Sequence, residues 1–372
     1  MKFHRSAIEA EGAEVIGYEN IKYNLAESSV RDRTLQDLGI EIRELELPYA
    51  KDHFGMTRLR ELIASQSGDH VETDHIMVTA GASAALFIVA ITFLEKGNHV
   101  VITRPNYCTN IETPEAIGCD ISFIDLRFEN RFRVDLDYLE SVVTPATRYI
   151  SLTCPNNPDG SMLSLDELKH VIRIAERNDT WLLVDETYRE MAHEEVLPVA
   201  ATLSDRVISI SSMSKTYGVP GIRIGWLHCQ DSHLMESFLC AKEQMSIHGS
   251  VLDETVAYET LMQKDQWLNE VRPEILQGKS IVGQWVSGDE FIDWVEPDGG
   301  TTCFARIDAD LEIDYDAFYD RLLKQYGTYV GPGHWFGFSK NHMRIGFAWN
   351  EMDKLKRGLE GISRNIRDFA RN

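Results

Sequence analysis

Short apolar runs alternate with helical patterns between about residues 70 and 230. The runs are rich in Val, Ile and Leu and show little polar alternation: His75–Thr79, His99–Thr103, Asp120–Asp125, Arg148–Thr153, Trp181–Asp185, Arg206–Ser211 and Ile222–His228. Strands with such a pattern are buried on both faces of a sheet, and helices between them provide the cover. The pattern therefore predicts a mostly parallel sheet within an α/β domain.

Two helices of this domain are marked by their first residues. One is expected from about Ser83 to Glu95, after a glycine and in a run of small residues. The other begins near Ser164, because a serine N-cap followed three residues later by Glu167 fits a capping box. Both helices follow strands, as an α/β order requires.

The last third of the chain has a different pattern. Strands are expected at Thr301–Asp308 and His342–Trp349, each next to a helical pattern, and a long helical region from about Leu234 to Gly283 precedes them. Mixed strands and helices of this kind predict a smaller α+β domain. We therefore expect an N-terminal segment at 1–45 that packs with the small domain, a large domain at 46–275 and the small domain at 276–372.

Composition narrows the class of protein. The chain has 372 residues and a formal net charge of -22, and so acidic a surface disfavours binding to nucleic acid or to anionic membranes. Its six cysteines form no CxxC pair and no zinc-finger spacing, which predicts no metal site and a reducing, cytoplasmic environment. The first residues lack the apolar core of a signal peptide, in agreement with that expectation.

Polar and aromatic residues follow the expected strands, at the carboxyl ends where α/β sheets bind ligands. Gly81, Ala82 and Ser83 open a helix whose free N–H groups and dipole can hold an anion. Later strand ends supply an aromatic ring, an amide, a buried carboxylate and a phenol, which belong to Tyr107, Asn157, Asp185 and Tyr188. Each feature alone also fits a structural role: an N-cap, a packing ring, a turn amide or an ion pair.

The stretch SSMSKTYGVPGIRIGW (211–226) adds the reactive group. Lys215 follows a strand and shares its loop with Ser212 and Arg223. A lysine in a partly dry site near another cation has a lowered pKa, so its amine can react with an aldehyde. An arginine holds phosphate through paired hydrogen bonds. Together with the other strand ends, these residues predict a site for pyridoxal 5′-phosphate (PLP), with its ring nitrogen facing a carboxylate.

The chain resembles the class I/II aminotransferases, which are fold-type I PLP-dependent enzymes. Four segments carry the resemblance in order and spacing: NNPDG (156–160), VDETY (184–188), SMSKTYGVPGIRIGW (212–226) and MRIGFA (343–348). The resemblance implies a seven-stranded sheet in the large domain and a homodimer with active sites at the interface. It also implies amino-group transfer from an amino acid to a 2-oxo acid.

The same resemblance implies a role for each residue of the site. Lys215 bonds to the cofactor aldehyde and later shuttles a proton, and Asp185 pairs with the pyridine nitrogen. Asn157 and Tyr188 hydrogen-bond the ring oxygen, and Arg344 binds the substrate α-carboxylate beside Asn157. The remaining cofactor contacts are a ring that stacks on the pyridine and a set of phosphate ligands: Tyr107, then Gly81, Ala82, Ser83, Ser212 and Arg223.

The stretch NLAESSVRDRTLQDL (24–38) lacks the aliphatic hinge usual in the family and resembles capreomycidine-synthase-like members of the fold. Those enzymes eliminate a substituent from a hydroxylated arginine and cyclise its guanidine. Glu27 and Ser28 are then expected to bind the substrate, with Glu27 paired to a guanidinium or an ammonium. A solvated carboxylate at a helix start is the alternative for Glu27. Further candidate side-chain contacts are His53, His248 and Trp335.

Two functions remain open after this comparison. Amino-group transfer is the leading hypothesis, and PLP-dependent elimination and cyclisation of an arginine-type substrate is the alternative. A PLP-binding transcription regulator is disfavoured by the acidic charge, and a dinucleotide dehydrogenase by the lack of a GxGxxG after any strand. The resemblance is weaker at the usual cross-subunit tyrosine, where Ala50 stands here with Tyr49 one residue earlier.

Overall fold

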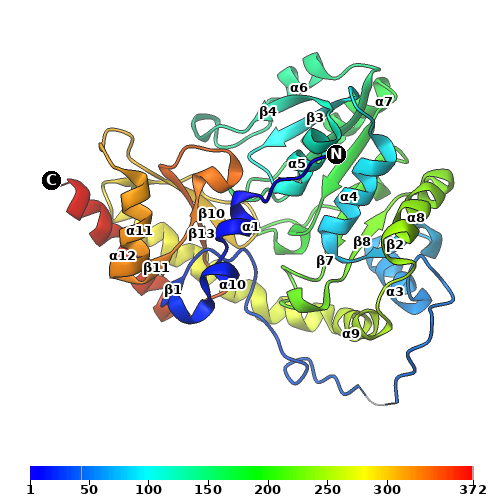
Figure 1. Cartoon of the computed structure of the whole chain (residues 1–372), viewed down its shortest axis with the longest axis horizontal. Coiled ribbons are helices and arrows are strands. Elements are labelled where there is room, and N and C mark those ends of the chain that lie inside the picture. The colour runs from blue at the N-terminus through cyan, green and yellow to red at the C-terminus, as the bar shows by residue number, and fades with distance from the viewer. Residues whose placement is uncertain (43, 371–372) are drawn as a thin grey trace.

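A seven-stranded sheet forms the centre of the larger part of the molecule (Figure 1). The computed structural model describes residues 1–42 and 44–370. The strands are β2 (Ile76–Thr79), β3 (His99–Arg104), β4 (Asp120–Asp125), β5 (Thr147–Thr153), β6 (Trp181–Asp185), β7 (Val207–Ser212) and β8 (Gly225–His228). Their order is β2-β8-β7-β6-β5-β3-β4, and only β8 is antiparallel to its neighbours in this sheet. The predicted α/β fold with a mostly parallel seven-stranded sheet is confirmed.

Helices cover both faces of this sheet, which explains why its strands lack polar alternation. Val101 packs into the core on one face and its neighbour Ile102 into the core on the other. The predicted capping box is present, since Ser164 and Glu167 accept hydrogen bonds from each other's backbone N–H. The covering helices are α4 (Gly81–Phe93), α5 (Cys108–Ile117) and α8 (Ser232–Ser246) on one face, and α6 (Leu136–Val142) and α7 (Leu165–Arg177) on the other.

A second, antiparallel sheet of four strands forms the smaller part. In order along the sheet, its strands are β12 (Gly331–Pro332), β13 (His342–Gly346), β10 (Thr302–Ile307) and β9 (Ile292–Asp293). The helices α11 (Tyr315–Tyr326) and α12 (Met352–Ala370) pack beside it. The domain boundaries expected after residues 45 and 275 stay predictions.

The helical region between the two sheets is divided. In place of one long element, the structure has α8, α9 (Val251–Met262) and α10 (Lys264–Ser287), and α3 (Thr57–Ser67) packs on α9. The break before α9 is marked by Ser250, whose side chain accepts a hydrogen bond from Asp253 N and caps the helix. Within the described residues, no helix combines the length and the apolar surface that a membrane-spanning segment needs.

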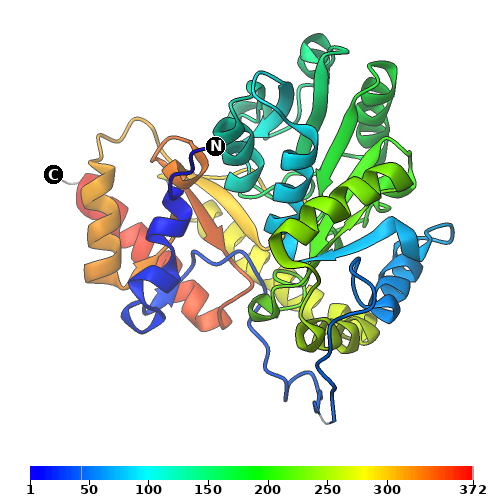
Figure 2. The same ribbon diagram turned by 45° about the vertical axis from the view of Figure 1, so that its right-hand side comes forward.

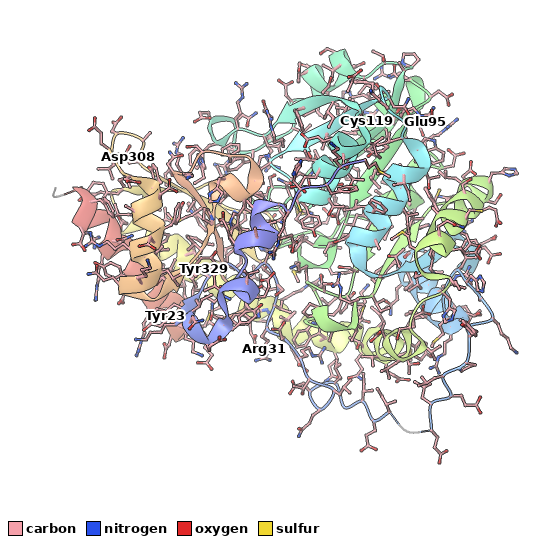
Figure 3. The ribbon with its side chains drawn as sticks, viewed as in Figure 1. Tyr23, Arg31, Glu95, Cys119, Asp308 and Tyr329 are labelled. Carbon is pink, nitrogen blue, oxygen red and sulfur yellow. The ribbon has the colours of Figure 1, made fainter. Side chains whose placement is uncertain are left out.

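The N-terminal segment connects the two parts of the molecule. It contains α1 (Ala7–Glu11), α2 (Ala13–Ile16), the 3₁₀ turn η1 (Tyr18–Asn20) and β1 (Tyr23–Asn24), which pairs in parallel with β11 (Thr328–Tyr329). Figure 3 marks Tyr23 and Tyr329 in these two strands. Figures 1 and 2 show the N-terminus beside the helices of the large sheet, whereas α1 lies against the smaller part.

Side-chain contacts hold both ends of this segment. The rings of Phe3 and Phe87, on α4, lie 6.1 Å apart between centroids. At the other end, Glu11 Oε2 accepts hydrogen bonds of 2.8 Å from Trp335 Nε1 and from His334 Nε2. The segment is therefore fixed to the large sheet's helices and to the smaller part at once.

Candidate active site

The predicted residues gather around one cavity of about 470 Å³ beyond the carboxyl ends of the central strands. Among the residues predicted from the sequence, the lining includes Glu27, Ser28, Ala82, Ser83, Tyr107, Asn157, Asp185, Tyr188, Ser212, Lys215, Arg223 and Arg344. The N-terminal segment and the turn η7 (Gly333–Phe336) add Ile8, Ala13 and Trp335 to the lining. The cavity is thus closed by both sheets and the N-terminal segment.

Arg223 lies next to the start of α4. Its Nη1 donates hydrogen bonds to the Ser214 hydroxyl at 3.3 Å and to the Pro220 carbonyl at 3.0 Å. It forms no ion pair with any residue that the structure describes. A Cβ on Gly81 would lie 2.6 Å from Arg223 Nη2, so the glycine leaves room for the guanidinium. The predicted link between Gly81 and Arg223 is therefore a direct backbone contact.

The first turn of α4 faces the same end of the cavity. Its N-cap residue, Ala80, has no side chain that can accept a hydrogen bond, so the first N–H groups, including those of Ala82 and Ser83, are not capped. The Ser83 hydroxyl lies 3.1 Å from the Tyr107 hydroxyl. An unpaired guanidinium beside an uncapped helix N-terminus suits a phosphate group.

Asp185 ends β6 and is buried, with a relative exposure of 4%. Its Oδ1 accepts hydrogen bonds from Thr187 N at 3.0 Å and from Thr187 Oγ1 at 2.6 Å. Burial raises the pKa of Asp185, and the two hydrogen bonds from Thr187 oppose that shift. The ion pair considered for this carboxylate is absent among the described residues, so a positively charged ring nitrogen is a suitable partner.

Lys215 follows β7 and is partly buried in the cavity wall. Burial lowers the pKa of its amine, Arg344 and Arg223 lower it further, and Glu27 acts in the opposite direction. Its Nζ makes no hydrogen bond or ion pair with the part of the chain that the structure describes. An amine with these surroundings is the group that the sequence predicted for reaction with an aldehyde.

Arg344 lies on β13 and is buried to 4% relative exposure. Its Nη1 donates to Asn157 Oδ1 at 3.1 Å and its Nη2 to the Ala26 carbonyl at 2.7 Å, while Nε is buried without a partner in the described structure. The guanidinium carbon lies 5.9 Å and 5.1 Å from the ring centroids of Trp335 and Phe336. A fixed, buried guanidinium with an unpaired N–H suits a carboxylate ligand.

Glu27 is held by two donors of its own segment. Its Oε1 accepts hydrogen bonds from Tyr18 Oη at 3.0 Å and from Asn24 Nδ2 at 3.2 Å. The adjacent Ser28 hydrogen-bonds Tyr188. Burial raises the pKa of Tyr188 to about 12, although Arg344 and Ser28 oppose that shift. The structure therefore places both predicted residues in the cavity wall, next to the groups expected to bind substrate.

Two candidates from the sequence lie elsewhere. His53 and His248 are not part of the cavity lining. His53 Nδ1 lies 2.6 Å from Glu243 Oε1, and the His53 and His248 rings pack 6.4 Å apart. Their prediction as substrate contacts is wrong, because the segment at 44–53 follows α8 and α9 and does not turn toward β7.

Sequence reasoning missed the carboxylates of Glu9 and Glu14, which also line the cavity, and the partner roles of Ser214 and Thr187. Ser214 and Thr187 lie within motifs that were recognised, so their hydroxyls were detectable beside Lys215 and Asp185. Glu9 and Glu14 carry no such signal, because their segment reaches the cavity only through contacts with residues more than 300 positions away.

These observations test whether PLP fits the site. Arg223 and the start of α4 provide an anion cradle, the buried Asp185 lacks a cation, and the Lys215 amine is free within the described structure. The three features match the phosphate, the basic ring nitrogen and the aldehyde of PLP. The residues present therefore fit this cofactor.

The fold and the cavity define a fold-type I PLP-dependent enzyme. Residues 51–362 match the model of the family "Aminotransferase class I and II", and the chain belongs to that family. Capreomycidine synthase of Streptomyces vinaceus is 29% identical over 368 residues, which cover 95% of this chain and 92% of that protein. An arginine–pyruvate transaminase of Pseudomonas aeruginosa is 29% identical over 307 residues, covering 79% of this chain and 76% of that one.

A solved structure is similar over almost the whole chain. A PLP-dependent aminotransferase from Streptococcus suis superimposes with a TM-score of 0.91 and 26% identity, covering 99% of both chains. The predictions of a PLP-dependent enzyme, of an aminotransferase of this family and of PLP as its cofactor are confirmed. The roles of individual residues stay predictions and enter the proposal that follows.

Proposed function

We propose that this enzyme transfers the α-amino group of an amino acid with a cationic side chain to a 2-oxo acid. The observation that carries the proposal is the pair of charges around the Lys215 amine. Arg344 lies buried with an unpaired N–H, and Glu27 is held in the same cavity by Tyr18 and Asn24. An α-carboxylate and a side-chain cation of one substrate match these two groups. The names of the transaminase and the synthase reported above are consistent with an arginine-type substrate.

Each residue has a defined task in this proposal. When bound, PLP supplies an aldehyde that condenses with amines and a ring that delocalises negative charge from Cα. Lys215 holds the cofactor and its Nζ accepts the Cα proton, a task that the lowered pKa favours because more of the amine is neutral. Asp185 keeps the ring nitrogen protonated, and Arg344 orients the substrate through its carboxylate.

The cofactor contacts of the remaining predicted residues belong to the same proposal. Tyr107 stacks on the ring, Asn157 and Tyr188 hydrogen-bond the ring oxygen, and Tyr188 together with Lys215 and Asp185 forms the catalytic set. The phosphate is bound by the start of α4, the β7 end and the guanidinium beside them: Gly81, Ala82, Ser83, Ser212 and Arg223.

Elimination and cyclisation of a hydroxylated arginine-type substrate is the second candidate. It is favoured by the similarity to capreomycidine synthase, which extends over 95% of this chain. The same lysine, carboxylate and arginine serve both reactions, because each begins with loss of the Cα proton. The two candidates differ only in the fate of the electrons, either to a second substrate or to a leaving group.

We also propose a cytoplasmic homodimer, as the family resemblance implies. Large apolar side chains are exposed at 72% for Leu47 and 79% for Tyr49 in the segment before α3. Ile247, at the end of α8, is 51% exposed, and the Tyr49 and His248 rings pack edge to edge at 5.4 Å. These side chains provide apolar surface for a second copy.

The proposed reaction predicts a transfer of nitrogen. Purified enzyme loaded with PLP is incubated with L-arginine labelled with nitrogen-15 at the α-amino group, and with pyruvate. The label is expected in alanine, measured by mass spectrometry. A cyclic product that retains the label when a hydroxylated arginine is supplied would support the second candidate. If the label stays on arginine and on lysine with every 2-oxo acid tried, the proposal of amino-group transfer from cationic substrates is wrong.

A further inference from the structure

Gly12 and Glu14, in the N-terminal segment, line the cavity beside Glu27. A Cβ on Gly12 would lie 2.7 Å from Glu14 Oε2 and 2.8 Å from Oε1, so the Glu14 carboxylate folds back over Gly12. Gly12 has a φ of -57° and a ψ of 159°, a conformation that other residues also adopt. The glycine is therefore needed for the position of the carboxylate and not for the backbone.

The Glu14 carboxylate acts on the reacting end of the cavity. Burial lowers the pKa of both Lys215 and Arg344, and the negative charges of Glu27 and Glu14 oppose that shift at both groups. Glu14 makes no hydrogen bond and no ion pair with residues 1–42 or 44–370. It is therefore a free carboxylate directed at the space between the lysine and the arginine.

A charge balance shows what this space lacks. Under the proposed function, the cofactor phosphate neutralises Arg223, and Asp185 pairs with the ring nitrogen. The substrate α-carboxylate pairs with Arg344, whose buried and unpartnered Nε is an independent sign of a ligand at that end. Glu27 and Glu14 then face the substrate with no cation between them. A negatively charged side chain would be repelled there, and a positively charged one attracted.

We infer that Glu14 is a specificity-determining residue: with Glu27 it binds the terminal guanidinium or ammonium of the substrate side chain. This inference rests on the proposed function. A guanidinium carries five N–H donors and so serves two carboxylates at once, whereas the neutral ureido group of citrulline, of nearly the same shape, attracts neither. Gly12 keeps the carboxylate in this position.

The test compares L-arginine with L-citrulline on the PLP-loaded enzyme. Glu14→Gln is expected to lower kcat/KM for arginine about tenfold, which is the loss of one charge-assisted hydrogen bond, and to change kcat/KM for citrulline less than about twofold. Gly12→Ala is expected to act in the same direction by displacing the carboxylate. Glu19→Gln, an exposed glutamate of the same segment outside the cavity, is the matched control and should match the wild type.

Binding and folding are measured beside turnover. Titration of the cofactor absorbance with arginine is expected to show a dissociation constant raised by the same factor in Glu14→Gln, with an unchanged melting temperature. Equal losses for arginine and citrulline, or no loss for either, would overturn the role of Glu14. A wild-type enzyme that uses neutral or acidic amino acids but neither arginine nor lysine would instead overturn the proposed function.

Discussion

Lys215→Ala is expected to lower kcat at least about a thousandfold, the largest effect of any single substitution in this chain. The substitution removes both the amine that holds PLP and the base that takes the Cα proton. Burial lowers the pKa of this amine, and Arg344 and Arg223 lower it further, so a neutral base is present near neutral pH. The measurement is the rate of α-amino transfer under saturating substrate.

The control for this prediction is Lys169→Ala, which removes an exposed lysine of α7 far from the cavity and should leave kcat unchanged. Circular dichroism and added PLP show whether the variant is folded and loaded. A folded Lys215→Ala enzyme that retains more than about a tenth of the wild-type rate would be incompatible with a base at this position.

Asp185→Asn is expected to lower kcat by two orders of magnitude or so, because removing one partner of a buried charge pair costs about 3–5 kcal/mol. Asparagine has nearly the same shape but cannot balance the charge on the ring nitrogen. The buried carboxylate has no cation among the described residues, which leaves it available for that nitrogen. The rate of Cα proton exchange, followed by deuterium incorporation, measures the effect at the step where the ring is needed.

A graded variant separates charge from packing at the same position. Thr187→Val removes the 2.6 Å hydrogen bond to Asp185 Oδ1 and keeps the carboxylate. We expect a loss of about tenfold or less, since one hydrogen bond to a charged group is worth about 1.5–3 kcal/mol at most. If Asp185→Asn were as active as Thr187→Val, the carboxylate charge would have no part in catalysis.

The large sheet and most of the site were predictable from the sequence because their signals are local. Each buried strand shows a continuous apolar run, and the chemistry follows directly after it, as Asp185 follows β6 and Lys215 follows β7. The strand expected at Ile222–His228 begins only at Gly225, since Pro220–Ile222 forms a 3₁₀ turn and Arg223 has a φ of 52°. That irregular backbone is what places Arg223 against Gly81.

The substrate end of the cavity was harder to predict because distant segments form it. Glu14 reaches the cavity through the pairing of β1 with β11 and through the contact of Glu11 with Trp335. Neither contact has a periodic signal in the sequence. Glu27 was predicted only from a family resemblance, and the error at His53 has the same origin, since nothing local tells on which side of the sheet its segment runs.

The most direct test of the account is to locate the covalent bond between the cofactor and the protein. The enzyme is incubated with PLP, reduced with borohydride, digested, and analysed by peptide mass spectrometry. We expect the cofactor mass on the peptide that contains Lys215 and not on Lys242, the other buried lysine, whose pKa burial lowers to about 8 and whose Nζ donates to the His53 carbonyl. Cofactor mass on another lysine, or on none, would contradict the assignment of this cavity as the active site.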